Sequence, residues 1–301
     1  MRSALLVALG AALWSTDALF RHPLVQQLSP FTIVYFEHIF ATLISFAYVM
    51  CSRDRKLFFM DSKSLGAAAF IGVFGSAIAT VLFTMSFQLI NPSVTILLQK
   101  VQPMFVILIS FLFLGEKFKP GFFAWAAIAL VAGFFVSFPT GIQNIDLHSA
   151  NATGCFLALT AAILWAVSTT VGRLALHKAP ASVLSFWRFF FGLIALFTFS
   201  RRIETMQIEI PFVPGQPGVM RDLFIMALIP GFLGVNLYYS GLKKIQASVA
   251  TILELSFPIC AIAVNYYFLN FQLSLIQLLA SGILIVAMIG VSKSARRGPV
   301  D

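Results

Sequence analysis

The chain has 301 residues, of which 59% are hydrophobic and only 10% are charged, and its mean hydropathy is +0.94. This composition excludes an ordinary soluble domain and predicts an integral membrane protein. The net charge of +9 would suggest a nucleic-acid partner for a soluble protein. Here most charged residues lie between apolar segments, so we attribute the charge to orientation in a lipid bilayer and expect no nucleic acid.

Ten apolar segments follow one another along the chain, and each is predicted to form a membrane-spanning helix. They cover residues 4–20, 30–50, 65–89, 92–114, 120–139, 152–175, 182–200, 222–242, 246–269 and 273–292. Each crossing of a hydrocarbon core about 30 Å thick needs about 20 mostly apolar helical residues, so the ten helices would use nearly the whole chain. The one long connection, residues 201–222, contains three prolines and is predicted to be an irregular surface loop.

The lysines and arginines between the segments predict how the chain is oriented. With the N-terminus on the cytoplasmic side, the loops predicted to be inside contain 14 of these residues and the loops predicted to be outside contain 4. Because cytoplasmic loops carry an excess of lysine and arginine, we expect both termini to be cytoplasmic. We expect the membrane to be a bacterial inner (plasma) membrane.

The second five segments echo the first five. The recurring stretches are Leu13-Trp14 as Leu164-Trp165, and Val94–Gln99 with Pro103 as Val249–Glu254 with Pro258. An odd number of spans per repeat places the two halves in opposite orientations, an architecture that moves small solutes by alternating access. We therefore predict an all-α membrane protein of ten transmembrane helices, arranged as two inverted five-helix repeats (residues 1–145 and 146–301) around a central cavity.

Three stretches carry a resemblance to a known family: Ala12–Ser15, Phe113–Glu116 and Ser185–Phe189. Together with the ten segments and the echoed halves, they resemble the EamA family of the drug/metabolite transporter superfamily. The resemblance implies a bundle of two five-helix repeats around a central cavity. It also implies transport of amino acids, nucleotide-related metabolites or other small polar compounds, many of them outward.

The chain departs from the family pattern in two places. The second span contains Glu37-His38 where the family usually has an arginine, so that only Arg188 of the seventh span is kept. The ninth span ends in Leu269-Asn270-Phe271 and lacks the Gly-Glu pair that follows the fourth span. These departures leave the fold prediction intact, but a substrate is not transferable from relatives.

Ionisable side chains deep in a span cost about 2.5–3.5 kcal/mol on insertion scales, so each needs an explanation. Glu254 is about eight residues from the inner end of its span, or roughly 12 Å deep at 1.5 Å per residue. We predict that Glu254 and its counterpart Gln99 face each other and line the cavity, or else form a hydrogen bond that only holds the helices together. Lys100 lies at a similar depth and either binds a substrate carboxylate or phosphate, relays charge, or forms an ion pair with Glu254.

The first and sixth spans place similar residues on one helical face. The series Gly10, Trp14, Asp17 and Arg21 corresponds to the series Ala161, Trp165, Ser168 and Gly172. Trp14 and Trp165 are predicted to stack on an aromatic or cationic group of a substrate, with ordinary packing as the alternative. Asp17 and Arg21 have the spacing of a helix salt bridge and are predicted to form either an outer gate or a simple surface pair.

Other polar residues in the spans are candidates for proton coupling or for anchoring a helix at the membrane interface. Glu37 and His38 could titrate during proton coupling, since histidine changes charge near neutral pH, or one of them could face a polar group of a neighbouring helix. Arg188 is predicted to anchor its helix by reaching towards the interface. Four tyrosines near span ends are predicted to belong to interfacial aromatic belts: Tyr238, Tyr239, Tyr266 and Tyr267.

No nucleophile constellation, metal-binding motif or phosphate-binding loop is found in the sequence, so we predict no enzymatic activity, no metal and no cofactor. The predicted function is gradient-driven secondary transport of a small polar metabolite by alternating access. The substrate would be an amino acid or related compound, and the protein would act as an exporter or exchanger, with a proton or counter-metabolite as coupling partner. A flippase for a lipid-linked or headgroup substrate is the alternative. We expect a monomer or a homodimer in the lipid bilayer.

Overall fold

The computed structural model describes residues 2–90, 92–141, 151–203, 206–209, 218–269 and 272–294. All regular elements of these residues are helical. Nine helices or continuous helix runs in the described residues are long and apolar enough to cross a membrane, and one further apolar helix is shorter.

The first half of the chain contains the elements up to α8. In chain order these are α1 (Arg2–Trp14), α2 (Asp17–Leu24), α3 (Pro30–Cys51), the short η1 (Arg53–Leu57), α4 (Ser62–Phe70), η2 (Ile71–Ile78), α5 (Ala79–Leu89), α6 (Pro92–Gln99), α7 (Gln102–Phe113) and α8 (Phe122–Ser137). The run from α4 to α5 is continuous, and its middle part, η2, is a π-helix.

The second half follows a similar order of elements, with the single helix α9 in place of α1 and α2. These are α9 (Ala152–Ala175), α10 (Ala181–Arg202), α11 (Gly218–Met226), η4 (Ala227–Gly234), α12 (Val235–Leu242), α13 (Ala247–Leu253), α14 (Ser256–Leu269) and α15 (Leu275–Ser294). The run from α11 to α12 again contains a π-helix, η4, in its middle part. In this half Pro230 lies inside the π-helix, and it lacks the N–H that a regular helix needs there.

Each of the ten predicted segments coincides with a helix or helix run. The sixth begins and ends where it was predicted, and the eighth begins at residue 218, four residues earlier than expected. The fifth, α8, has only 16 residues, so it is the shorter apolar helix. Of the long connection 201–222, residues 211–217 with all three prolines lie outside the described residues.

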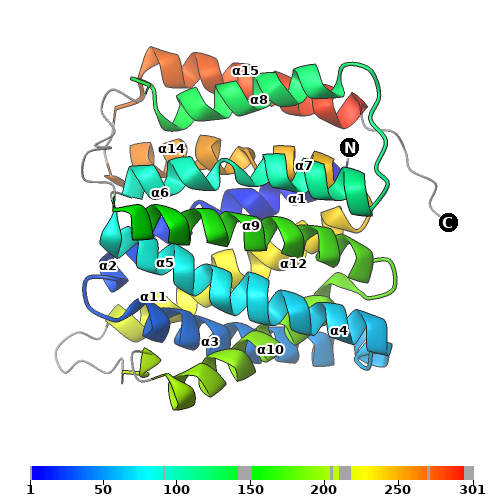
Figure 1. The fold of residues 1–301 in the computed structure, drawn as a ribbon, viewed down its shortest axis with the longest axis vertical. Helices are drawn as coiled ribbons and strands as arrows, with labels where there is room; N and C mark the ends of the chain where they lie inside the picture. The colour runs from blue at the N-terminus through cyan, green and yellow to red at the C-terminus, as the bar shows by residue number, and fades with distance from the viewer. Residues whose placement is uncertain are drawn as a thin grey trace.

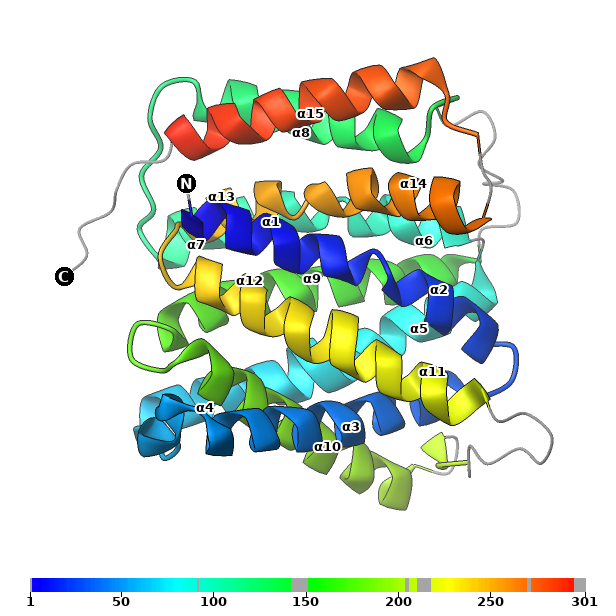
Figure 2. The ribbon, with the colours of Figure 1, turned by 180° about the vertical axis from the view of Figure 1, so that it is seen from behind.

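The helices run roughly side by side in stacked layers (Figure 1). α8 and α15 pack on each other at one end of the stack, and α3 and α10 pack on each other at the opposite end. Between them, α1 contacts α12 and α14, while α9 contacts α5 and α7 (Figure 2). The contacts that α1 makes with the second half thus recur as the contacts that α9 makes with the first half.

Glycines allow the closest helix contacts. A Cβ on Gly10 of α1 would lie 2.7 Å from the carbonyl oxygen of Gly234, and a Cβ on Gly192 would lie 2.7 Å from the ring of His38. Gly290 of α15 packs even more closely on the indole of Trp125 in α8. Small residues of this kind let helices approach where hydrophobicity cannot hold them together.

The fourth and ninth segments are broken in the middle, at Lys100 and Glu254. Pro103 and Pro258 follow the two breaks, and proline lacks an N–H and clashes with the carbonyl four residues before it. Those carbonyls belong to Gln99 and Glu254. The backbone N–H of Phe257 bonds to the Glu254 carbonyl at 2.9 Å instead. The prolines therefore place two deep ionisable residues at interruptions of their helices.

Candidate functional site

Glu254 lies at the break between α13 and α14, where its carboxylate accepts two hydrogen bonds. The hydroxyl of Tyr238, in α12, donates to Oε1 at 2.5 Å. The side-chain amide of Gln102, at the start of α7, donates to Oε2 at 3.2 Å. One carboxylate thus joins three segments from both halves of the chain.

Within the described residues, neither Lys100 nor Gln99 bonds to Glu254. The Lys100 ammonium lies 5.1 Å from the centre of the Phe257 ring, and within the described residues it forms no ion pair with Glu254 at 4.0 Å or less. No hydrogen bond joins the Gln99 side chain to a described residue. The structure therefore brings Gln102, one turn further along the same helical face, to Glu254.

The two tryptophans occupy matching places. The Trp14 ring lies 5.0 Å from that of Tyr238, and the Trp165 ring lies 5.0 Å from that of Phe83. Each tryptophan packs on an aromatic residue of the other half, which is the packing that the sequence allowed as the alternative. Only the Trp14 pair reaches a carboxylate, because its partner carries a hydroxyl that bonds to Glu254.

Arg21 forms the centre of a buried ion cluster. Its guanidinium contacts the two oxygens of Asp17 at 2.6 and 2.9 Å and Oε2 of Glu37 at 2.9 Å. It also donates to the hydroxyl of Thr84 at 3.2 Å. Arg21 is only 5% exposed, so the predicted salt bridge with Asp17 is present and the alternative of a simple surface pair is wrong. The cluster joins α2, α3 and α5.

His38 belongs to a second buried polar group. Its Nδ1 lies 2.8 Å from the Val34 carbonyl, and its Nε2 lies 3.1 Å from the Ser76 hydroxyl. Arg188 donates to the same hydroxyl oxygen through Nε and Nη2 at 3.3 and 3.2 Å, and to the hydroxyl of Tyr239 at 3.0 Å. Because a carbonyl only accepts, this pattern is satisfied by a neutral His38 that carries its proton on Nδ1.

Two predictions about polar residues are wrong. Tyr238 and Tyr239 are 3% and 2% exposed, so they do not belong to an aromatic belt, whereas the exposed Tyr266 and Tyr267 remain compatible with one. Arg188 bonds to groups inside the bundle and does not extend to an interface. Hydropathy alone places these residues near span ends, but the neighbouring helices decide what surrounds them.

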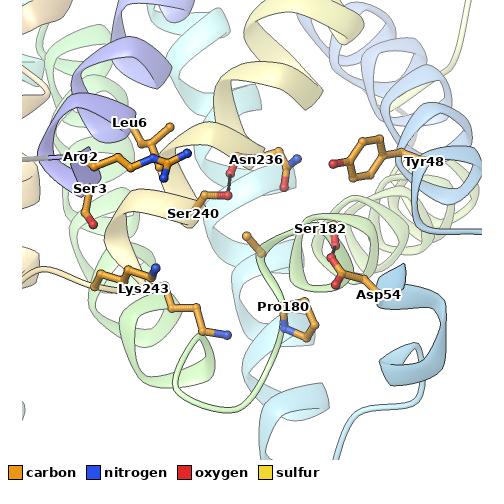
Figure 3. A pocket seen from close by; sticks show the side chains of 12 residues that line it. Arg2, Ser3, Leu6, Tyr48, Asp54, Pro180, Ser182, Asn236, Ser240 and Lys243 are labelled. Carbon is orange, nitrogen blue, oxygen red and sulfur yellow. Dashed lines mark hydrogen bonds between the residues drawn. The ribbon is translucent and has the colours of Figure 1, made fainter. Parts of the chain in front are cut away.

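A cavity of about 520 Å³ opens between α1, α3, α10 and α12, at the end of the bundle where α1 begins (Figure 3). It is lined by Arg2, Ser3, Leu6, Tyr48, Asp54, Pro180, Ala181, Ser182, Asn236, Ser240, Lys243 and Lys244. None of the site residues predicted from the sequence lines it. Sequence reasoning missed this site because most of its residues lie at helix ends and in loops. Within the described residues, no group of three or more His, Cys, Asp or Glu side chains could hold a metal ion.

The sequence profile of the EamA-like transporter family matches residues 1–138 and again residues 152–293. The chain belongs to the EamA-like transporter family. It is accordingly an integral membrane protein and a transporter, not an enzyme. The two matched ranges together span nearly all of the chain. The structure describes most of their residues.

Several relatives of this EamA-like protein are named as transporters. It is 26% identical over 299 residues to the riboflavin transporter ImpX of Fusobacterium nucleatum, a match that covers 97% of this chain and 98% of that protein. It is 22% identical over 288 residues to an uncharacterized transporter of Archaeoglobus fulgidus, covering 96% and 98%. A solved crystal structure has the same fold, with a TM-score of 0.77 and 16% identity over 98% of this chain and 99% of that one.

Proposed function

We propose that the protein is a secondary transporter of a small polar metabolite that works by alternating access between two inverted five-helix repeats, residues 1–145 and 146–301. Two observations support the repeats. The contacts of α1 with α12 and α14 recur as those of α9 with α5 and α7, and the family profile matches the chain twice. The proposal counts α8, the fifth segment, as a span in addition to the nine longer ones, and its 16 residues would cross the bilayer only where it is thin or where neighbours cover its ends.

The observation that carries the proposal is the asymmetry between the two ends of the bundle. At one end lies the cavity of about 520 Å³. At the other end, where α2 lies (Figure 2), Arg21 joins three segments through buried bonds. With the predicted orientation, the cavity faces the cytoplasm and the Arg21 cluster acts as the outer gate. Opening the outer side would separate α2 from α3 and so break the bond between Arg21 and Glu37.

In this proposal Glu254 links the state that is open to the cytoplasm with the state that is open to the outside. Its carboxylate joins α7 and α12 near the midplane, at helix interruptions that provide a natural hinge. A movement of one repeat against the other would change its partners, and Lys100, which has no carboxylate partner within the described residues, would then be available to it. We propose that Glu254, Lys100 and Gln102 form the coupling site, with Trp14 and Trp165 as its aromatic walls and Gln99 beside it.

The candidate substrates come from the family resemblance and from one relative. The resemblance suggests an amino acid or related compound moved outward or by exchange, with Glu37 and His38 as candidates for proton coupling. The relative ImpX is named a riboflavin transporter, so riboflavin is the first compound to test. A cavity of about 520 Å³ is within the range of about 300–1,000 Å³ that holds small ligands.

Transport into liposomes tests the proposal. Purified protein is reconstituted, and uptake of riboflavin and of each of the twenty amino acids is measured with and without a proton gradient of either sign. Each uptake is also measured into liposomes that were preloaded with the same compound. We expect at least one compound to be transported by the wild type and by Asp222→Asn, a control that alters a surface pair. We expect Glu254→Gln to lose most of this transport.

Two outcomes would contradict the proposal. If folded protein transports none of the compounds but moves fluorescent phospholipid between leaflets, the flippase alternative is favoured. If Glu254→Gln transports as well as Asp222→Asn, the coupling site is wrong even though the transport function stands.

A further inference from the structure

The cavity between α1, α3, α10 and α12 contains more positive than negative charge. Three cationic residues line it, Arg2, Lys243 and Lys244, and one carboxylate, Asp54. Among the described residues, none of the three cations forms an ion pair at 4.0 Å or less. Asp54 is instead bonded by the hydroxyl of Ser182 at 2.5 Å.

An excess of one charge sign in a concave site favours ligands of the opposite charge. Clefts with low-dielectric walls concentrate the field of the charges that line them and can raise the local concentration of the opposite ion and its association rate by about 10–10³-fold. Lys243 is held in place by a bond to the Ala179 carbonyl at 3.1 Å, which leaves its charge uncompensated. The cavity therefore attracts anions and repels cations.

Neutral polar groups lie beside these charges. Figure 3 shows Asn236 between Arg2 on one side of the cavity and Tyr48 on the other. The side-chain oxygen of Asn236 is buried and has no hydrogen-bond partner among the described residues. A buried acceptor without a donor is destabilising, and a donor group on a ligand would offset that cost. Ser240, one turn along α12, adds a hydroxyl to the same wall.

We propose that this cavity binds the carboxylate or phosphate group of a small anionic solute through Arg2, Lys243 and Lys244, while Asn236 bonds a donor group on the rest of the molecule. The proposal rests on the proposed function only where it makes that solute the transported compound, since binding can be measured without transport. It also separates this chain from the relative named for riboflavin, because riboflavin is uncharged at neutral pH.

Thiol chemistry measures the charge preference directly. In a protein whose three cysteines are replaced by serine, Ser240→Cys is reacted with two thiosulfonate reagents of similar size, one bearing a sulfonate and one a trimethylammonium group. The ratio of the sulfonate rate to the trimethylammonium rate at the protein cysteine is divided by the same ratio measured for a free small thiol. We expect the sulfonate reagent to be preferred about tenfold or more at Ser240→Cys, and clearly less so at Ser62→Cys, an exposed position that does not line the cavity.

Charge removal provides the matched comparison. Arg2→Gln and Lys244→Gln, added to Ser240→Cys, are expected to lower the preference several-fold each. Lys63→Gln removes an exposed lysine on the same predicted side and should leave it unchanged. If the trimethylammonium reagent reacts as fast as the sulfonate, or if Lys63→Gln acts like Lys244→Gln, the positive charge serves only orientation in the bilayer and the proposal is wrong.

Protection experiments on the wild type and on Ser240→Cys identify the source of the anion. Glycerol 3-phosphate and succinate are expected to slow the labelling of Ser240→Cys and to raise the melting temperature of the wild type, whereas glycerol and succinamide are not. Protection only in nanodiscs that contain phosphatidylglycerol, and not in phosphatidylcholine alone, would assign the site to a lipid headgroup and overturn a soluble ligand. Anion protection without transport of any compound would contradict the proposed function but leave this site intact.

Discussion

Two tryptophan sites at matching places in the two halves have similar packing and different chemistry. Trp14 and Trp165 each lie 5.0 Å from an aromatic ring of the opposite half. The partner of Trp14 is Tyr238, whose hydroxyl bonds to Glu254. The partner of Trp165 is Phe83, which has no hydroxyl, and the counterpart of Glu254 is Gln99, an uncharged residue.

The residues next to the tryptophans differ in the same direction. Asp17 and Arg21 follow Trp14 and join the buried ion cluster. Their counterparts after Trp165 are Ser168 and Gly172, and the hydroxyl of Ser168 has no hydrogen-bond partner within the described residues. The two halves therefore share contact geometry, which packing demands, while ionisable groups gather around one tryptophan only.

Removing Arg21 should have the largest effect on stability. Arg21→Gln would leave the buried Glu37 and the partly buried Asp17 without their counter-charge, and breaking a buried ion network by removing one partner costs about 3–5 kcal/mol. We expect a clear drop in the unfolding temperature in detergent. This variant removes the cation that the Trp165 site also lacks. It leaves Asp17 and Glu37, two acids that have no acidic counterpart at the Trp165 site.

A triple variant decides whether the cost of Arg21→Gln is electrostatic. Combining Arg21→Gln with Asp17→Asn and Glu37→Gln removes both orphaned charges, and buried ion networks replaced as a whole are often close to neutral in stability. We therefore expect the triple variant to recover much of the loss. If it is as unstable as Arg21→Gln, the cluster stabilises the fold through packing and unpaired charge does not explain the cost.

Tyr238→Phe converts the Trp14 pair into a copy of the Trp165 pair. It removes one hydroxyl and leaves Glu254 with the weaker bond from Gln102. Hydrogen bonds to charged groups contribute about 1.5–3 kcal/mol, so we expect a loss of stability in that range by thermal unfolding. Glu254→Gln in the same background should then cost little more, because the coupling between the two residues is already lost. Additive losses would show that Tyr238 and Glu254 act independently.

The sequence was sufficient for the helices but not for their partners. The helix at 152–175 follows from hydropathy, which depends only on residues that are neighbours in the chain. The bond between Tyr238 and Glu254 depends on how α12 packs against the interrupted run of α13 and α14, and hydropathy does not specify that packing. Gln102 was within reach of prediction, since it shares a face with Gln99, but the break at Lys100 decides which of the two glutamines contacts Glu254.

Gly10→Ala tests the contact that supports the Trp14 site. A Cβ at this position would lie 2.7 Å from the Gly234 carbonyl oxygen and 2.8 Å from the Tyr238 nitrogen, and overpacking of this kind costs about 1–3 kcal/mol. Gly282→Ala is the control, since nothing lies within 4 Å of a Cβ there. We expect only Gly10→Ala to lower the unfolding temperature. Equal effects of the two alanines would mean that α1 and α12 can move apart without cost.

Lys100→Met should have the smallest effect on stability and a large effect on transport. The counterpart of Lys100 in the second half is Leu255, so the variant removes the charge that distinguishes the two helix breaks. Its ammonium has no carboxylate partner within the described residues, and its contact with Phe257 is worth about 0.5–2 kcal/mol, which the lower cost of burying a thioether largely offsets. We expect an unfolding temperature near that of the wild type and a loss of liposome transport. If transport is intact in both Lys100→Met and Glu254→Gln, the charge asymmetry around the midplane has no part in the transport cycle, and the difference between the halves belongs to stability alone.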